Sequence, residues 1–168
     1  MMAPRETASH TPYTNAVSCK LKKMTFTEKQ VQDFFERIDK LDSSQKPKFG
    51  EMNVNQMVCH CTDFFRMANG NKKAEEYGVV DPKDILKLSR SGKTAPAPKG
   101  FGQTEGEGTA PIDFESDKKI LKKHILEFSK LDKDYKFSEH PYFGNISFER
   151  WIELAVYHLN HHLKQFYV

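Results

Sequence analysis

HPYFGNISFERWIELAVYHLNHHLKQF, residues 140–166, contains the strongest helix signal in the chain. Ser147 is a typical N-cap residue. After it, apolar side chains recur three and four residues apart, which is the spacing of one helical face. These side chains belong to Phe148, Trp151, Ile152, Ala155, Leu159 and Phe166. The stretch therefore predicts a long amphipathic helix that packs against other helices.

Three further segments carry the same pattern. A capping box at Thr27–Gln30 opens a helix that runs to about residue 41, and Asn53 with Gln56 opens a second one that ends near Gly70. A third helix covers residues 120–131. Their apolar faces are formed by Val31, Phe34, Phe35, Ile38 and Leu41, then by Val54, Met57, Cys61, Phe64, Phe65 and Ala68, and then by Ile120, Leu121, Ile125, Phe128 and Leu131.

The connection over residues 71–112 is too long for a hairpin turn. It contains the Pro-, Gly- and Thr-rich run KTAPAPKGFGQTEGEGTAP, and only Asp81–Pro82 opens a short helix, through Leu88. No segment alternates as a strand does. The sequence therefore predicts an all-α fold, a four-helix bundle with a long crossover between helices 2 and 3. We expect the bundle to occupy residues 25–168, after a flexible or weakly docked N-terminal arm over residues 1–24.

Composition excludes several classes of protein. The chain has 168 residues, enough for one domain, and its 26 Lys plus Arg against 23 Asp plus Glu give a net charge of +3. The surplus lies in the first 50 residues, so we expect no nucleic acid partner. No apolar run approaches the ~18 residues of a membrane helix, so no membrane association is expected. Three cysteines without C-x-x-C spacing indicate a reducing compartment, and we expect a cytoplasmic protein.

Three histidines fall where apolar residues are expected. His60 lies in the middle of the apolar stripe of the second helix, and His158 and His162 lie one turn apart on the inward face of the last one. Buried imidazoles need partners, and a metal ion would satisfy all three with a coordination position left open. Zinc is the first choice, and nickel, iron or manganese suits the same ligands. From the residues alone, three ordinary core histidines are an equal alternative.

Two glutamines share these faces. Gln56 lies one turn before His60, and Gln165 lies three residues after His162. Either could orient a ligand or contact a substrate. The simpler interpretations are a capping role for Gln56 and an ordinary polar position at the helix end for Gln165.

The remaining candidates are weaker. His161 points about 100° away from His162, so we expect it at the solvent edge. His124 is a reserve ligand that is more typical of a boundary histidine, and His140, before Pro141, favours a structural role in its loop. Cys59 and Cys61 flank His60, but successive helical residues diverge, so we expect buried thiols rather than ligands.

Two stretches, NVNQMVCHCTDFF at residues 53–65 and the closing stretch with its H-x-x-H-H-x-x-Q ending, resemble the DinB and YfiT-like metal-binding superfamily. The resemblance covers about residues 25–168. It implies a four-helix bundle with a long connection between helices 2 and 3, and a metal triad of His60, His158 and His162. Characterised relatives include thiol S-transferases that use bacillithiol or mycothiol, a maleylpyruvate isomerase that uses such a thiol, and proteins classed as metal-dependent hydrolases.

Two functions of different class follow. The first is a divalent-metal-dependent enzyme, a thiol S-transferase or a hydrolase, that acts on a small-molecule substrate through a metal-activated low-molecular-weight thiol or water. The second is a non-enzymatic bundle, a metal-binding or protein-interaction module that could form a homodimer. They differ in whether the open coordination side faces a pocket, lined by Trp151, Gln56, Gln165 and the crossover, or is plugged by a side chain such as His124.

Overall fold

The computed structural model describes residues 26–91 and 95–168, and the proposed arm over residues 1–24 lies outside these ranges. The described residues form five helices and no strand, which confirms the all-α prediction for this part of the chain. The helices are α1 (Glu28–Asp39), α2 (Val54–Ala68), α3 (Pro82–Arg90), α4 (Phe114–Ser129) and α5 (Phe148–Gln165).

The helix starts follow from side chains that cap backbone N–H groups. Thr27 and Asn53 each form a complete capping box, with Gln30 and Gln56 respectively, and the Ser147 hydroxyl accepts a hydrogen bond from the Arg150 N–H. These three predicted starts are confirmed. Helix α4 begins earlier than its apolar pattern indicated, because the Asp113 carboxylate caps it by accepting from the Ser116 N–H.

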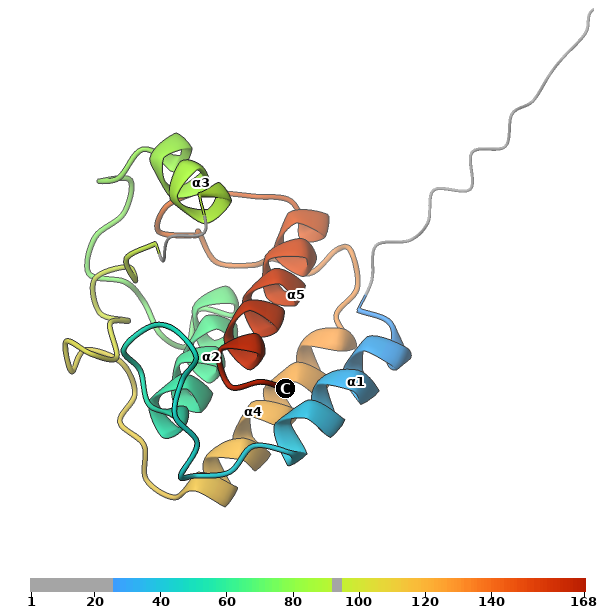
Figure 1. The fold of residues 1–168 in the computed structure, drawn as a ribbon. Helices are drawn as coiled ribbons and strands as arrows, with labels where there is room; N and C mark the ends of the chain where they lie inside the picture. Colours follow the sequence, from blue (N-terminus) through green and yellow to red (C-terminus); the bar gives the residue numbers. More distant parts are fainter. Residues whose placement is uncertain (1–25, 92–94) are drawn as a thin grey trace, which may run out of the picture.

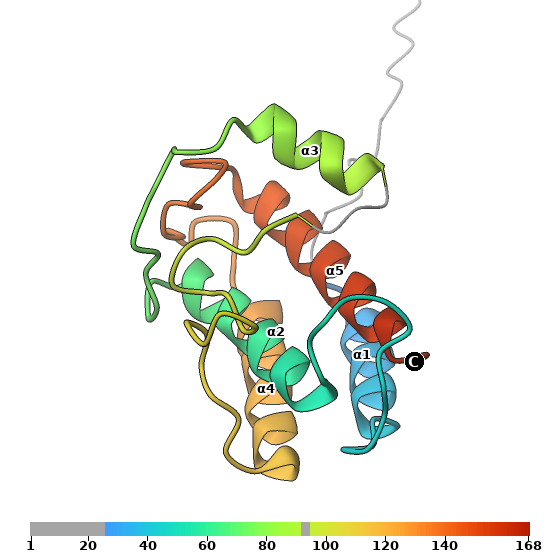
Figure 2. The same ribbon diagram turned by 60° about the vertical axis from the view of Figure 1, so that its left-hand side comes forward.

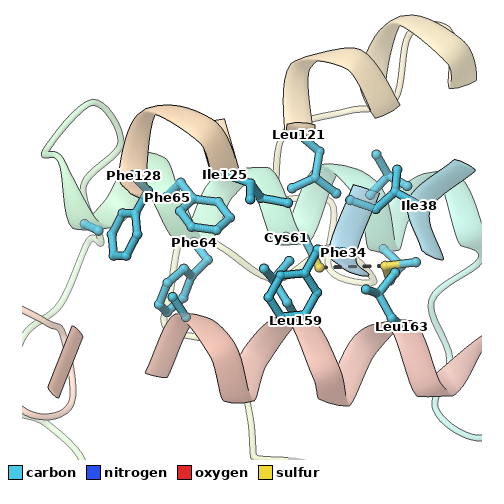
Figure 3. Packing of buried hydrophobic residues seen from close by; sticks show 14 of the residues in the cluster. Phe34, Ile38, Cys61, Phe64, Phe65, Leu121, Ile125, Phe128, Leu159 and Leu163 are labelled. Atoms are coloured by element: carbon cyan, nitrogen blue, oxygen red, sulfur yellow. Dashed lines mark hydrogen bonds between the residues drawn. The ribbon is translucent and has the colours of Figure 1, made fainter. Parts of the chain in front are cut away.

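Helices α1, α2, α4 and α5 pack around one apolar core, in which α4 and α5 each contact both α1 and α2 (Figure 1). In Figure 3, Leu159 and Leu163 of α5 face Leu121 and Ile125 of α4 across this core. Ile120 is an exception to the predicted apolar face. Its side chain is 38% exposed, because it lies about 100° around α4 from the fully buried Leu121.

The connection between α2 and α4 is folded back on the molecule. Its short helix α3 packs against none of the other described helices and lies outside the group formed by α1, α2, α4 and α5 (Figures 1 and 2). Within the described residues, no helix combines the length and the apolar character needed to cross a membrane.

Candidate metal centre

Three imidazoles from two helices meet beside the core. His60 comes from α2, and His158 and His162 come from successive turns of α5. One nitrogen of each ring lies within 4.8 Å of the corresponding nitrogens of the other two, and the three ring centroids are 4.5–4.9 Å apart. The structure thus brings together the three histidines that the helical stripes selected, at a separation that one metal ion can bridge.

Two of these rings leave a buried nitrogen without a partner. Nδ1 of His60 and Nε2 of His158 are enclosed by protein and form no hydrogen bond. An enclosed polar atom without a hydrogen bond costs free energy, and native structures contain few of them. A metal ion is the partner that both lone pairs would share, so the donor set fits a divalent cation.

The third ring, that of His162, is oriented by a relay of two hydrogen bonds, which runs from the Phe49 carbonyl in the loop before α2 through the Gln165 amide to the ring. The Gln165 Nε2 donates to the Phe49 carbonyl at 3.3 Å, which turns the amide oxygen Oε1 toward His162. This oxygen lies 2.6 Å from the His162 Nδ1. Because an amide oxygen only accepts, the His162 Nδ1 must carry the proton, and Nε2 keeps its lone pair for a metal. Gly50 leaves room for the relay, since a Cβ there would lie 2.7 Å from the Gln165 Nε2.

Loss of the relay should weaken metal binding without unfolding the chain. We expect Gln165→Leu to lower zinc affinity about 10- to 100-fold, because an unheld His162 ring can change its tautomer and its rotation. Competition with a chromogenic chelator measures this affinity. Gln56→Leu is the matched control, since Gln56 closes the α2 capping box and hydrogen-bonds the Gln103 carbonyl. Equal weakening in both variants would contradict the role of Gln165.

Gln56 and Gln165, the two glutamines singled out in the sequence, therefore differ. Gln56 has the capping role of the simpler interpretation, with one further contact to the crossover. Gln165 is 2% exposed and contacts the His162 ring directly, so it is more than an ordinary polar residue at a helix end.

Burial keeps the three imidazoles neutral. It lowers the pKa of His60 to about 4, and the Asp63 carboxylate and a hydrogen bond to the Phe101 backbone only partly oppose it. The pKa values of His158 and His162 lie well below 6.5, first through burial and then through the neighbouring imidazoles. Neutral imidazole is the form that ligates metals, so the ring nitrogens are ready to bind at neutral pH.

These pKa values predict an acid-sensitive metal-free protein. In the unfolded chain the same histidines have pKa values near 6.5, so below this pH the unfolded state binds more protons and stability falls. We expect the free energy of unfolding to drop by up to about 1.4 kcal/mol per pH unit for each such histidine as the pH decreases from 6.5 toward 4. Urea unfolding of chelator-treated protein at several pH values measures this slope, and a flat profile between pH 6.5 and 5 would contradict it.

A cavity of about 900 Å³ opens onto the triad. All three histidines and Gln165 line it, and so do segments of the crossover around Pro98 and Gln103. Trp151 and Gln56, which we expected in its wall, do not line it. His124 lies on α4, near Glu127, and is not among the lining residues, so it does not plug the open side of the triad.

Asp63 is a site residue that the sequence analysis missed. It lies three residues after His60, its side chain is fully buried, and its carboxylate accepts hydrogen bonds from the Thr109 N–H at 2.8 Å and from the Thr109 hydroxyl at 2.6 Å. Arg66 and Lys72 lie 3.3 and 3.5 Å from its oxygens. This cluster ties the crossover to α2 beside the triad. Its only sequence signal is an acidic residue next to a run of apolar helix positions.

His161, Cys59 and Cys61, which the sequence analysis also considered, do not belong to the triad. His161 is half-buried, lines the cavity and stacks near Tyr157. Cys59 and Cys61 are buried free thiols, as expected. Burial raises the pKa of Cys59 to about 12 and also raises that of Cys61, so neither is a thiolate at neutral pH.

The site is thus a set of three neutral imidazoles, two with unpartnered buried nitrogens and one held by an amide, at the wall of a large cavity. Such a set can bind a cation and leave a position facing the cavity. Comparisons of the chain with protein-family models, with curated proteins and with solved structures find no match.

Proposed function

We propose that this chain is a divalent-metal-dependent enzyme, a thiol S-transferase or a hydrolase, with the four-helix bundle of the DinB and YfiT-like superfamily. The observation that carries the proposal is the pair of enclosed nitrogens, His60 Nδ1 and His158 Nε2, at the wall of the cavity. Nitrogen atoms that serve only to fill a core have no reason to converge without partners. Zinc suits three neutral imidazoles best, and nickel, iron or manganese can replace it.

When bound, the ion would lower the pKa of a thiol or of a water molecule at its open position and so supply the nucleophile. The protein's own residues prepare the place for this. Gln165 holds His162 in the ligating tautomer, and Phe64 and Phe101 contribute apolar walls to the cavity onto which the triad opens. The cavity has room for a small-molecule substrate beside a low-molecular-weight thiol, which favours an enzyme over a closed interaction module.

Elemental analysis of the untagged chain tests the proposal. We expect about one ion per chain as purified or after titration with zinc, nickel, iron or manganese. A panel of low-molecular-weight thiols with electrophiles, and of esters without thiols, then distinguishes the transferase from the hydrolase. A folded chain that takes up none of the four metals would overturn the proposal and would leave the non-enzymatic module as the better description.

A further inference from the structure

A fourth imidazole, that of His140, faces the same cavity from the loop before α5. Its Nδ1 lies 3.1 Å from the backbone nitrogen of Tyr142 and 3.4 Å from that of Phe143. Both nitrogens are N–H donors, so the His140 Nδ1 accepts both bonds and carries no proton. This is the structural role in the loop that the sequence favoured.

The acceptor role of Nδ1 fixes the rest of the ring. A neutral imidazole carries one proton, which must then lie on Nε2. Burial lowers the pKa of His140 to about 4, so the ring is neutral at pH 7. Contacts with the rings of Phe143 and Trp151, at centroid distances of 4.7 and 5.3 Å, hold its plane. The protein therefore presents a fixed Nε2–H donor at this position.

The donor is open to the cavity. Within residues 26–91 and 95–168, the His140 Nε2 has no hydrogen-bond partner, yet it is not one of the enclosed nitrogens. His140 lines the cavity together with the triad. Its ring contacts Trp151, the Trp151 ring contacts Phe64, and Phe64 stacks on His158. The donor and the triad therefore face one shared cavity.

The walls of the cavity suit an apolar ligand. They are formed largely by apolar side chains, among them Met52, Phe64, Leu86, Pro98, Phe143 and Leu154. Among the charged residues that line the cavity, Arg150 and Glu153 form an ion pair, with 2.8 Å between Nη1 and Oε2.

The remaining charged residues of the lining are one cation, Arg90, and two carboxylates, Glu51 and Glu105, so an anionic ligand gains little from them. A neutral N–H donor in such surroundings matches a neutral oxygen acceptor.

We propose that the cavity binds neutral, apolar carbonyl compounds, such as esters, thioesters, ketones or aldehydes, and that the His140 Nε2–H donates a hydrogen bond to their carbonyl oxygen. This assignment deepens the proposed function, on which it rests for the place of the reaction. The carbonyl would be held next to the position where the triad faces the cavity, so His140 would orient the group that is attacked.

Two substitutions of His140 separate the roles of its two ring nitrogens. In His140→Asn, the side-chain oxygen takes the place of Nδ1 and can still accept from the Tyr142 and Phe143 N–H groups, while the Nε2–H donor is lost. His140→Leu loses both functions. We expect the Asn variant to melt close to the original protein and the Leu variant to melt at a clearly lower temperature.

Binding is measured with acetophenone and ethylbenzene, which differ in the carbonyl oxygen, by NMR titration of the chelator-treated chain. We expect His140→Asn to weaken acetophenone binding about 5- to 10-fold and to change ethylbenzene binding less than about twofold. An equal change for both probes would reduce His140 to a structural residue and overturn the donor role. Failure of both probes to bind the original protein would overturn the ligand class.

Long-range proton–nitrogen NMR of histidine-labelled, chelator-treated protein supplies a second readout. We expect the His140 Nε2 to be protonated and Nδ1 to be unprotonated at pH 7, and the opposite tautomer would overturn the proposal. Because both measurements use chelator-treated protein, they report on His140 even if the triad proves not to bind metal. Failure of this inference and failure of the proposed metal function are therefore distinguishable.

Discussion

Replacing His158 with leucine is expected to abolish metal binding and to stabilise the metal-free protein. Loss of a residue that merely orients a ligand costs 10- to 100-fold in affinity, so loss of a ligand should cost more than about 100-fold. The stability gain has a separate cause. The buried Nε2 of His158 has no partner, and its removal should raise the free energy of unfolding by about 1–2 kcal/mol, less any loss of ring stacking on Phe64.

Metal titration and urea unfolding of chelator-treated protein measure the two effects. His161→Leu is the matched control, because His161 is the next histidine on the same helix, three residues after His158, and does not belong to the triad. It should keep the metal. A His158→Leu protein that retains the metal contradicts the site. A variant that is strongly destabilised without metal would show that His158 is an ordinary core residue.

His158→Leu is expected to lose metal binding but to gain stability without metal. This combination distinguishes a metal-binding position from an ordinary core position. In a core that evolved for stability, replacement of a well-packed residue usually destabilises the protein. A site that must receive a cation keeps lone pairs available, and it is less stable until the cation binds. His60 and His158 carry this cost in their enclosed nitrogens.

Helical periodicity was sufficient to predict which three histidines lie close together. His60, His158 and His162 occupy positions where each helix needs an inward residue, and the faces of α2 and α5 do meet. The starts of α1, α2 and α5 were equally predictable, because capping is a local interaction that its own residues specify.

Interactions between segments that are distant in the chain could not be predicted from the helical pattern. Gln165 is placed by the Phe49 carbonyl, and the burial of Asp63 depends on Thr109, which lies 46 residues further along the chain. Composition identified the crossover as a long connection, but hydrogen bonds to α2 make it a wall of the cavity. Patterns within one helix carry no information about such partners, and for this reason Trp151 and Gln56 were wrongly expected in the wall.

The crossover's attachment to α2 should depend strongly on Asp63. We expect Asp63→Ala to lower the free energy of unfolding by about 3 kcal/mol, because a buried carboxylate that accepts two short hydrogen bonds is removed and the Thr109 N–H loses its acceptor. Arg66 and Lys72 are partly exposed, so they can regain water, and this keeps the loss below that of a fully buried ion pair. Urea unfolding measures the change.

Two further variants separate the buried carboxylate from a general charge effect. Asp33→Ala removes an exposed acid that pairs with Arg37 on α1, and should change stability by less than about 1 kcal/mol. Thr109→Val removes the hydroxyl that donates to Asp63 and accepts from Arg66, keeps the backbone N–H bond to Asp63, and should cost about 1 kcal/mol. Amide hydrogen exchange should accelerate over residues 100–109 in Asp63→Ala more than in Asp33→Ala, because the loop loses its anchor. Equal losses in the two Asp variants, or unchanged exchange in the loop, would show that Asp63 does not hold the crossover over the histidines.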